Sequence, residues 1–230
     1  MKRTLVAFPV VVLCAAVAAQ ADQVVSYIPQ AKSMAQTSWR PDAQLVTIQV
    51  AGYDVELSPD GKTVKPDNTP KLVYFHFYSP SDENDYLVVS QPFNFPPEQK
   101  DIVRQHPELG SMRSQVLRAW TTTPLRNALP DEFMSVNDDV ALAQKSNLQA
   151  DCAGTNANYG CADVKFAELH MYIVGSGQML PIWRIRFGQD ARAKEITRLV
   201  NASSGRLITN CSVPDLSQST DRENLYLRCY

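Results

Sequence analysis

Few residues of this chain have types and spacings that could do chemistry. The sequence contains three histidines, His76, His106 and His170. His170 alternates with Glu168 and Tyr172, so on a β-strand these three side chains would share one face. A carboxylate, an imidazole and a phenol in one row could move a proton or supply part of a metal site. Such a row is more often a polar face of a sheet, and we expect that here.

Other catalytic arrangements are missing from the sequence. Gly175-Ser176-Gly177 lacks the full G-x-S-x-G pattern of a hydrolase nucleophile and predicts a hairpin turn. The acidic run Asp82-Glu83-Asn84-Asp85 lacks the glycine that an EF-hand calcium loop needs, which indicates a solvated loop tip. Because no nucleophile is paired with a base, we expect a protein that is not an enzyme and that needs no cofactor or metal.

The cysteines predict disulfides. Cys14 lies in an apolar stretch near the N-terminus, whereas Cys152, Cys161, Cys211 and Cys229 lie towards the C-terminus. An even number in an oxidising compartment predicts two disulfides, and three pairings are possible. We favour Cys152–Cys161 and Cys211–Cys229, because each pairing closes a local loop. Neither spacing provides the close cysteine pair that zinc sites usually contain.

Residues 1–21 predict a secretory signal peptide. Lys2 and Arg3 precede an apolar run, and Ala19-Gln20-Ala21 offers the small residues that a signal peptidase reads. We therefore expect the mature protein to be periplasmic or secreted. Without the signal the chain has 20 basic and 24 acidic residues, a balance that argues against nucleic-acid binding. No later apolar run approaches the roughly 18 residues of a membrane helix, so we expect no membrane span after cleavage.

Arginines gather in the last quarter of the chain at Arg184, Arg186, Arg198 and Arg206. The first two alternate with apolar residues and would project together from a strand. Such a cluster could dock an acidic partner, or it could merely discourage strands of different molecules from pairing. We take these four as candidate partner-binding residues and expect the partner to be another envelope or secreted protein.

Hydrophobic periodicity predicts two blocks of secondary structure. The first block has a helix at 27–39 and strands at 45–50, 54–57, 72–78 and 86–90. Prolines within 91–97 end this block, and apolar residues at helical spacing predict a helical connector over 98–130. The second block has a helix at 140–148 and strands at 164–174, 180–187, 195–200 and 206–209. The similar order of elements suggests that one unit is used twice.

Two short segments carry a resemblance to a known family. Leu180-Pro181-Ile182-Trp183-Arg184-Ile185-Arg186-Phe187 and then Asn201-Ala202-Ser203-Ser204-Gly205 resemble the last strands and turn of a PepSY-like domain. Residues 35–48, with Trp39 and Pro41, are similar to the helix-to-strand entry of such domains. The resemblance implies a cystatin-like helix on an antiparallel sheet. It also implies non-enzymatic envelope modules that bind or restrain other proteins, proteases among them.

These observations predict an α+β protein of two tandem helix-plus-antiparallel-sheet modules. The expected division is a signal peptide at 1–21, a first module at 22–91, a helical connector at 92–137 and a second module with the disulfides at 138–230. The expected function is non-catalytic protein binding or inhibition, with restraint of an envelope protease as one form. The alternative is a structural or assembly factor of a cell-envelope or surface complex.

Overall fold

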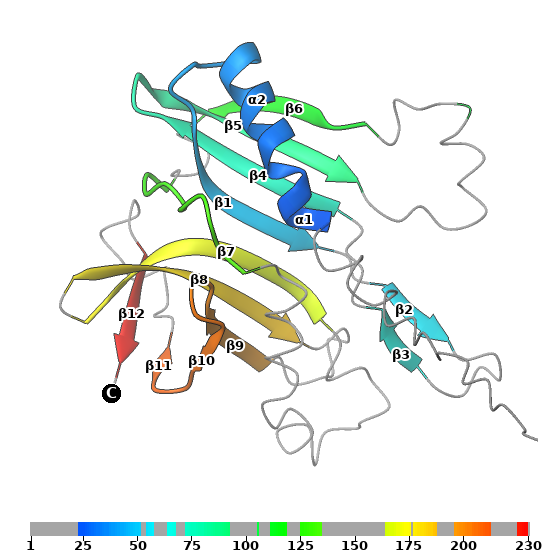
Figure 1. Cartoon of the computed structure of the whole chain (residues 1–230), viewed down its shortest axis with the longest axis vertical. Coiled ribbons are helices and arrows are strands. Elements are labelled where there is room, and N and C mark those ends of the chain that lie inside the picture. The colour runs from blue at the N-terminus through cyan, green and yellow to red at the C-terminus, as the bar shows by residue number, and fades with distance from the viewer. Residues whose placement is uncertain are drawn as a thin grey trace, which may run out of the picture.

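A single large sheet dominates the protein (Figure 1). The computed structural model describes residues 23–51, 54–57, 64–67, 72–92, 105, 111–118, 125–134, 164–175, 177–187, 196–212 and 225–229. The helices are α1 (Gln23–Ser26) and α2 (Ile28–Ser38). The strands are β1 (Gln44–Ala51), β2 (Asp54–Leu57), β3 (Val64–Asp67), β4 (Leu72–Ser79), β5 (Asp82–Pro92), β6 (Arg113–Arg118), β7 (Val164–Val174), β8 (Gln178–Phe187), β9 (Ile196–Asn201), β10 (Arg206–Ile208), β11 (Cys211–Ser212) and β12 (Leu225–Cys229).

Ten of these strands belong to the large sheet. Eight follow the order β10-β9-β8-β7-β1-β4-β5-β6, while β12 pairs with β7 and carries β11. The neighbours along the main path are antiparallel, and the β7–β12 pair is parallel. Strands β2 and β3 form a separate hairpin.

Turn residues close the hairpins where the sequence predicts them. Gly175 and Gly177 have φ of 51° and 95° between β7 and β8, a conformation that glycine adopts without strain. Between β9 and β10 the side-chain oxygen of Asn201 accepts hydrogen bonds from the backbone N–H groups of Ser203 and Ser204. Gly205 completes this turn with φ of 65°. Both turns confirm the sequence-based expectation.

Helix α2 covers one face of the sheet, which we call the first face. Ile28, Ala31 and Ala35 form its buried stripe, and the two alanines let the helix lie close to the strands. Figure 1 shows α2 lying across β1, β4 and β5. The helix ends before Pro41, as the sequence predicts.

The main core lies on this first face and extends across both halves of the sheet. Its largest fully buried side chains include Phe75 and Phe77 from β4 and Trp183 and Phe187 from β8. The extended segment 125–134 crosses the core: Leu129 N–H donates to the carbonyl of Leu45 at 2.8 Å, and Met134 N–H donates to that of Ala202 at 2.8 Å. The indole N–H of Trp183 donates to the Met134 carbonyl at 3.1 Å.

The opposite side, which we call the second face, has a smaller apolar cluster at the β7–β9 end. Tyr172, Ile182 and Leu199 pack there against two leucines of β12. The edge of β7 that pairs with β1 over residues 166–169 pairs with β12 over residues 172–174. A disulfide joins Cys211 to Cys229 and so fixes β12 to β11. This bond confirms one of the two predicted disulfides.

The expectation of two helix-plus-sheet modules is wrong. Residues Ile48–Ala51 of β1 pair with Phe166–Leu169 of β7, so the strands of both blocks join in one sheet. In the described part of the chain, one 11-residue helix and the single turn α1 are the only helical elements longer than one residue. The physical reason is that an edge strand with unpaired N–H and C=O groups is stabilised by a second edge strand.

The helical connector is also wrong where the structure describes it. Residues Arg113–Arg118 form β6, which pairs with β5 from Ser90 to Asp85. Met112 and Val116 lie at helical spacing, but the free edge of β5 satisfies this segment's backbone hydrogen bonds as a strand. Tertiary pairing therefore overrides the local pattern.

Several predictions concern residues outside the described ranges. These are the signal peptide at 1–21, His106, the helix at 140–148, and the Cys152–Cys161 pair. The internal repeat stays a prediction for the same reason, although β4 and β8 are each the second strand in a run of four antiparallel neighbours, β1-β4-β5-β6 and β7-β8-β9-β10.

Candidate functional site

A row of polar side chains crosses the second face of the sheet. Cross-strand pairing aligns Leu199, Arg184, Glu168, Gln49, Tyr74, Ser90 and Arg113, one from each of seven consecutive strands. A neighbouring row contains His170, Thr47, His76, Val88 and Gln115. We call the polar members of both rows the polar belt: Thr47, Gln49, Tyr74, His76, Ser90, Arg113, Gln115, Glu168, His170 and Arg184.

Glu168 is the centre of the belt on β7. One carboxylate oxygen lies 3.0 Å from Nη1 of Arg184, and the other lies 3.3 Å from Nε2 of His170. Burial raises the pKa of a carboxyl group, but the hydrogen bond and charge of His170 and the charge of Arg184 outweigh it. The pKa of Glu168 therefore lies below its ordinary value, and the carboxylate stays ionised at neutral pH.

His170 joins Glu168 to a hydroxyl on the next strand. Nδ1 of His170 lies 3.0 Å from Oγ1 of Thr47 on β1. Because an ionised carboxylate only accepts hydrogen bonds, the proton of the ring is on Nε2 facing Glu168. With the ring proton on Nε2, Nδ1 accepts a hydrogen bond from the hydroxyl of Thr47. Burial also raises the pKa of the neighbouring Tyr172 far above its ordinary value, so this phenol stays protonated.

His76 lies on β4, which pairs with the edge of β1 opposite to β7. Its Nε2 lies 3.0 Å from the side-chain oxygen of Gln49, and its ring stacks on Tyr86 at a centroid distance of 6.3 Å. Burial above all, and then the nearby His170, lower its pKa to about 4, with Glu168 opposing. The imidazole of His76 is therefore neutral at neutral pH.

Carboxylate, imidazole and hydroxyl follow one another in the order of an acyl-transfer relay, but the relay is closed to substrate. Thr47 is 5% exposed and His170 is 7% exposed. A nucleophile must reach a substrate carbonyl, and Thr47 lies within a central strand of the sheet. These three side chains therefore form a hydrogen-bonded network that links β1 and β7. Strand β7 carries His170, Glu168 and Tyr172 on one face, as their alternation predicts.

A cavity of about 340 Å³ opens at the β6 end of the belt. Tyr74, Val88 and Ser90 form its half-buried floor, and Arg113, Ser114 and Gln115 on β6 form its exposed rim. This group of residues is not predicted by the sequence. The polar residues of β6 give no local signal, because only pairing with β5 places them beside Tyr74.

The four candidate partner-binding arginines do not form one patch. Arg184 is held by Glu168, with 25% of its side chain exposed. By cross-strand pairing, Arg186 and Arg206 project from the same second face as Arg184. Arg198 is paired with Ile185 of the main core and so projects from the first face. The sequence alone could not show which of these arginines project from the same face, because this depends on the register of β9 with its neighbours.

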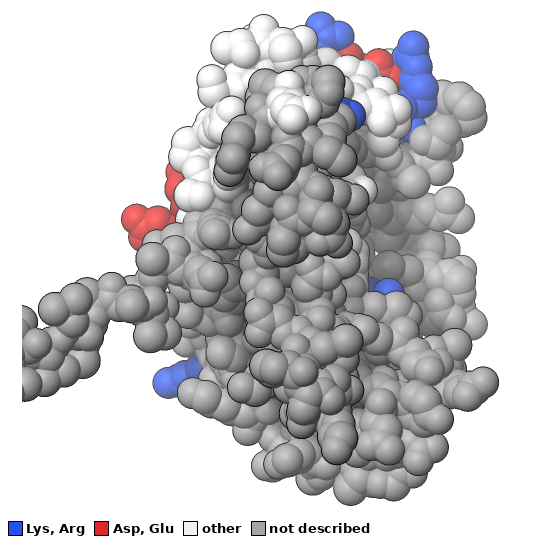
Figure 2. Space-filling model, turned by 90° about the vertical axis from the view of Figure 1, so that its right-hand side faces the viewer, with Lys and Arg blue, Asp and Glu red and all other residues white. Residues whose placement is uncertain are grey.

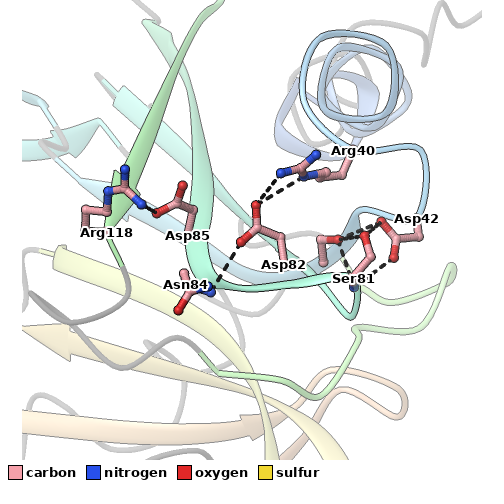
Figure 3. A network of polar contacts seen from close by, with 8 residues as sticks. Arg40, Asp42, Ser81, Asp82, Asn84, Asp85 and Arg118 are labelled. Carbon is pink, nitrogen blue, oxygen red and sulfur yellow. Dashed lines mark hydrogen bonds and ion pairs between the residues drawn. The ribbon is translucent and has the colours of Figure 1, made fainter.

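The acidic run is the beginning of β5 rather than a loop tip, and its carboxylates have arginine partners (Figure 3). Asp82 accepts from Nη2 of Arg40 at 2.5 Å, Asp85 lies 2.9 Å from Arg118, and Glu83 lies 3.4 Å from Arg126. The hydrogen bond and charge of Arg40 lower the pKa of Asp82. This network ties the segment that follows α2, through Arg40, and β6, through Arg118, to the β4–β5 hairpin, and these contacts offer no carboxylate cage for a cation.

A second part of this network lies in the β4–β5 turn. Asp42 accepts from the hydroxyl of Ser79 at 2.6 Å and from the hydroxyl and N–H of Ser81 at 3.0 Å each. These bonds lower the pKa of Asp42. Figure 2 shows Lys and Arg beside Asp and Glu along the upper edge of the molecule, so both signs of charge are mixed on the described part of that side.

Comparison with known proteins does not assign the chain to a family. No protein family profile matches the chain, and no curated protein matches it. The PepSY-like resemblance therefore stays a prediction. Among solved structures the chain is similar to one from Clostridium difficile 630 described as a "putative lipoprotein", with 12% identity over 79% of this chain and 89% of that one and a TM-score of 0.43. A likeness at this level supports no argument about function.

The described residues contain neither a membrane-spanning helix nor a cluster of metal ligands. No described helix is long and apolar enough to cross a membrane. No group of three or more His, Cys, Asp or Glu side chains in the described ranges could hold a metal ion.

Proposed function

We propose that this is a non-catalytic binding protein of the periplasm or the extracellular space, and that it binds another protein through Arg186 and Arg206, at the β8–β10 end of the second face of its sheet. The sequence supports export through residues 1–21. The Cys211–Cys229 disulfide supports an oxidising compartment, since such bonds are rare in the cytosol.

The observation that carries this proposal is the different use of the two faces. Among the described elements, α2 and most of segment 125–134 pack on the first face. The second face carries the polar belt, which ends at Arg184 on β8, and Arg186 and Arg206 lie on the same face near that end. A polar sheet face with cations at one end suits a protein partner with an acidic surface, because complementary charge speeds and orients association.

The closed state of the Thr47–His170–Glu168 relay supports the non-catalytic part of the proposal. Thr47 is only 5% exposed, so its hydroxyl is not accessible to a substrate. The three groups instead satisfy one another's hydrogen bonds, which is what buried polar groups in a sheet require.

The test compares charge reversal on the two faces. The mature protein is cross-linked to proteins of its native envelope fraction, the cross-linked partner is identified and purified, and binding is then measured with the two purified proteins. We expect Arg186→Glu combined with Arg206→Glu to weaken binding about tenfold or more at low salt. Arg198→Glu is the matched control, because it reverses an arginine on the first face of the same sheet region.

Arg184 is left unchanged in this test, since its reversal would also remove the partner of buried Glu168. Equal affinities for the second-face variant and Arg198→Glu would contradict the proposed surface. Recovery of a large multi-subunit complex would favour the assembly role over restraint of a single partner. Turnover of a substrate by the purified protein would contradict the non-catalytic assignment.

A further inference from the structure

The cavity over β4, β5 and β6 has the chemistry of a small-ligand site. At about 340 Å³ it lies at the small end of the range for ligand pockets, which runs from about 300 to 1,000 Å³. It is built on three paired strands, so its floor is fixed by backbone hydrogen bonds on both sides of β5. Sites on strands hold their side chains in more precise positions than sites on loops.

The lining side chains define which ligand would fit. Cross-strand pairing places Tyr74, Ser90 and Arg113 in one row and Val88 and Gln115 in the next, all on the second face. The phenol, hydroxyl and amide offer hydrogen-bond donors and acceptors around one apolar side chain. The ligand must therefore be polar over most of its surface, with one apolar side.

Charge narrows the ligand class further. Arg113 is the cation among the six described lining residues, and none of the six is acidic. Arg113 already takes part in an interaction within the protein, but a guanidinium has five N–H donors and can serve a second acceptor. Its forked donors match the two oxygens of a carboxylate.

We propose that this cavity binds a small hydroxylated carboxylate, of which a hexuronic acid is an example. The carboxylate pairs with Arg113, and the ligand hydroxyls exchange hydrogen bonds with Ser90 and Gln115. The C–H side of the ligand lies against Val88 and the ring of Tyr74. This site is independent of the protein-binding proposal, which concerns the arginines at the opposite end of the sheet.

The test is a titration of the folded mature protein with glucuronate, followed by amide chemical shifts in NMR. Glucose is the matched ligand without the carboxylate, and acetate is the carboxylate without the hydroxyls. We expect glucuronate to bind with a dissociation constant below about 10 mM and to shift resonances of β5 and β6. Glucose and acetate should each bind at least about tenfold more weakly.

Two variants on one strand provide the protein controls. Arg113→Gln should weaken glucuronate binding about tenfold or more, and Arg113→Lys, which keeps the charge and loses the fork, should fall between it and the wild type. Arg118→Gln removes the same charge from β6, but its side chain faces the first face and pairs with Asp85, so binding should be unchanged.

Three results would overturn this proposal. One is the absence of shifts in β5 and β6 up to about 10 mM glucuronate. Another is equal binding of glucose and glucuronate, which would mean that no carboxylate is recognised. The third is an equal loss in Arg113→Gln and Arg118→Gln, which would indicate a general charge effect. If Arg113→Gln does not fold, the comparison of Arg113→Lys with Arg118→Gln decides.

Discussion

Buried His76 should make this protein less stable as the pH falls from neutral. In the folded protein its pKa is about 4, whereas the ordinary value is 6.5. The unfolded chain therefore takes up a proton below pH 6.5, but the folded protein takes it up only near pH 4. The contribution of neutral His76 to the free energy of unfolding is fully present above pH 6.5. It is lost as the pH falls from 6.5 to 4, because the unfolded state binds more protons there than the folded state.

The size of the effect follows from the two pKa values. A difference of one pH unit corresponds to about 1.4 kcal/mol, so the full loss on reaching pH 4 is about 3 kcal/mol. Between pH 7 and pH 5 the loss should be about 2 kcal/mol. Glu168 adds to the loss only at lower pH, because its pKa is lowered and its contribution disappears below the ordinary range of a carboxyl group.

The assay is urea unfolding of the wild type and of His76→Gln at pH 7 and pH 5. Glutamine is neutral at both values and can still approach Gln49, so the variant should lose about 2 kcal/mol less than the wild type over this interval. An NMR titration of the imidazole of His76 measures its folded-state pKa directly.

Two results would refute the reasoning. A pKa for His76 near 6.5 in the NMR titration would mean that burial does not disfavour the charged ring. A variant that loses as much stability as the wild type between pH 7 and pH 5 would assign the acid sensitivity to other groups.

Three further changes test the architecture. Trp183→Ala should lower the free energy of unfolding by about 3–5 kcal/mol in urea denaturation, since the ring is fully buried in the main core; a loss below about 1 kcal/mol would contradict this packing. Replacing Cys211 and Cys229 together by serine should cost about 2–4 kcal/mol by the same method, whereas an unchanged midpoint would mean that β12 is held without the bond. Arg184→Gln should cost about 1–2 kcal/mol and raise the pKa of Glu168 in an NMR titration, because one of the two partners of that carboxylate is lost.

Much of the secondary structure could be predicted from the sequence because it rests on local physics. The spacing of Ile28, Ala31 and Ala35 predicts the helix, since the same stripe is buried in the structure. Alternation predicts β1, β7 and β8, and the turn residues predict where the hairpins reverse. The Cys211–Cys229 bond was also predictable, as it closes a short loop of the sequence.

Part of the polar belt was visible in the sequence, and the rest was not. Glu168, His170 and Tyr172 share a face by alternation alone. Thr47 and His76 belong to strands more than 90 residues away from them. No local pattern predicts that Thr47 will contact His170 or that His76 will lie near it. A polar residue at position 47 or 49 of an apolar strand was the available hint, because an unpaired polar group is rarely buried.

Except for β6, the sequence by itself determined which segments form the main strands of the sheet, which face of each is apolar and where the chain turns, because these depend on neighbours a few residues apart. Only the tertiary structure decided that β1 pairs with β7, and therefore that there is one sheet rather than two modules. It also decided that residues 113–118 join the edge of β5 and complete the cavity. Strand edges are satisfied by whichever partner the rest of the fold brings to them, and backbone hydrogen bonding carries no sequence signature of that partner.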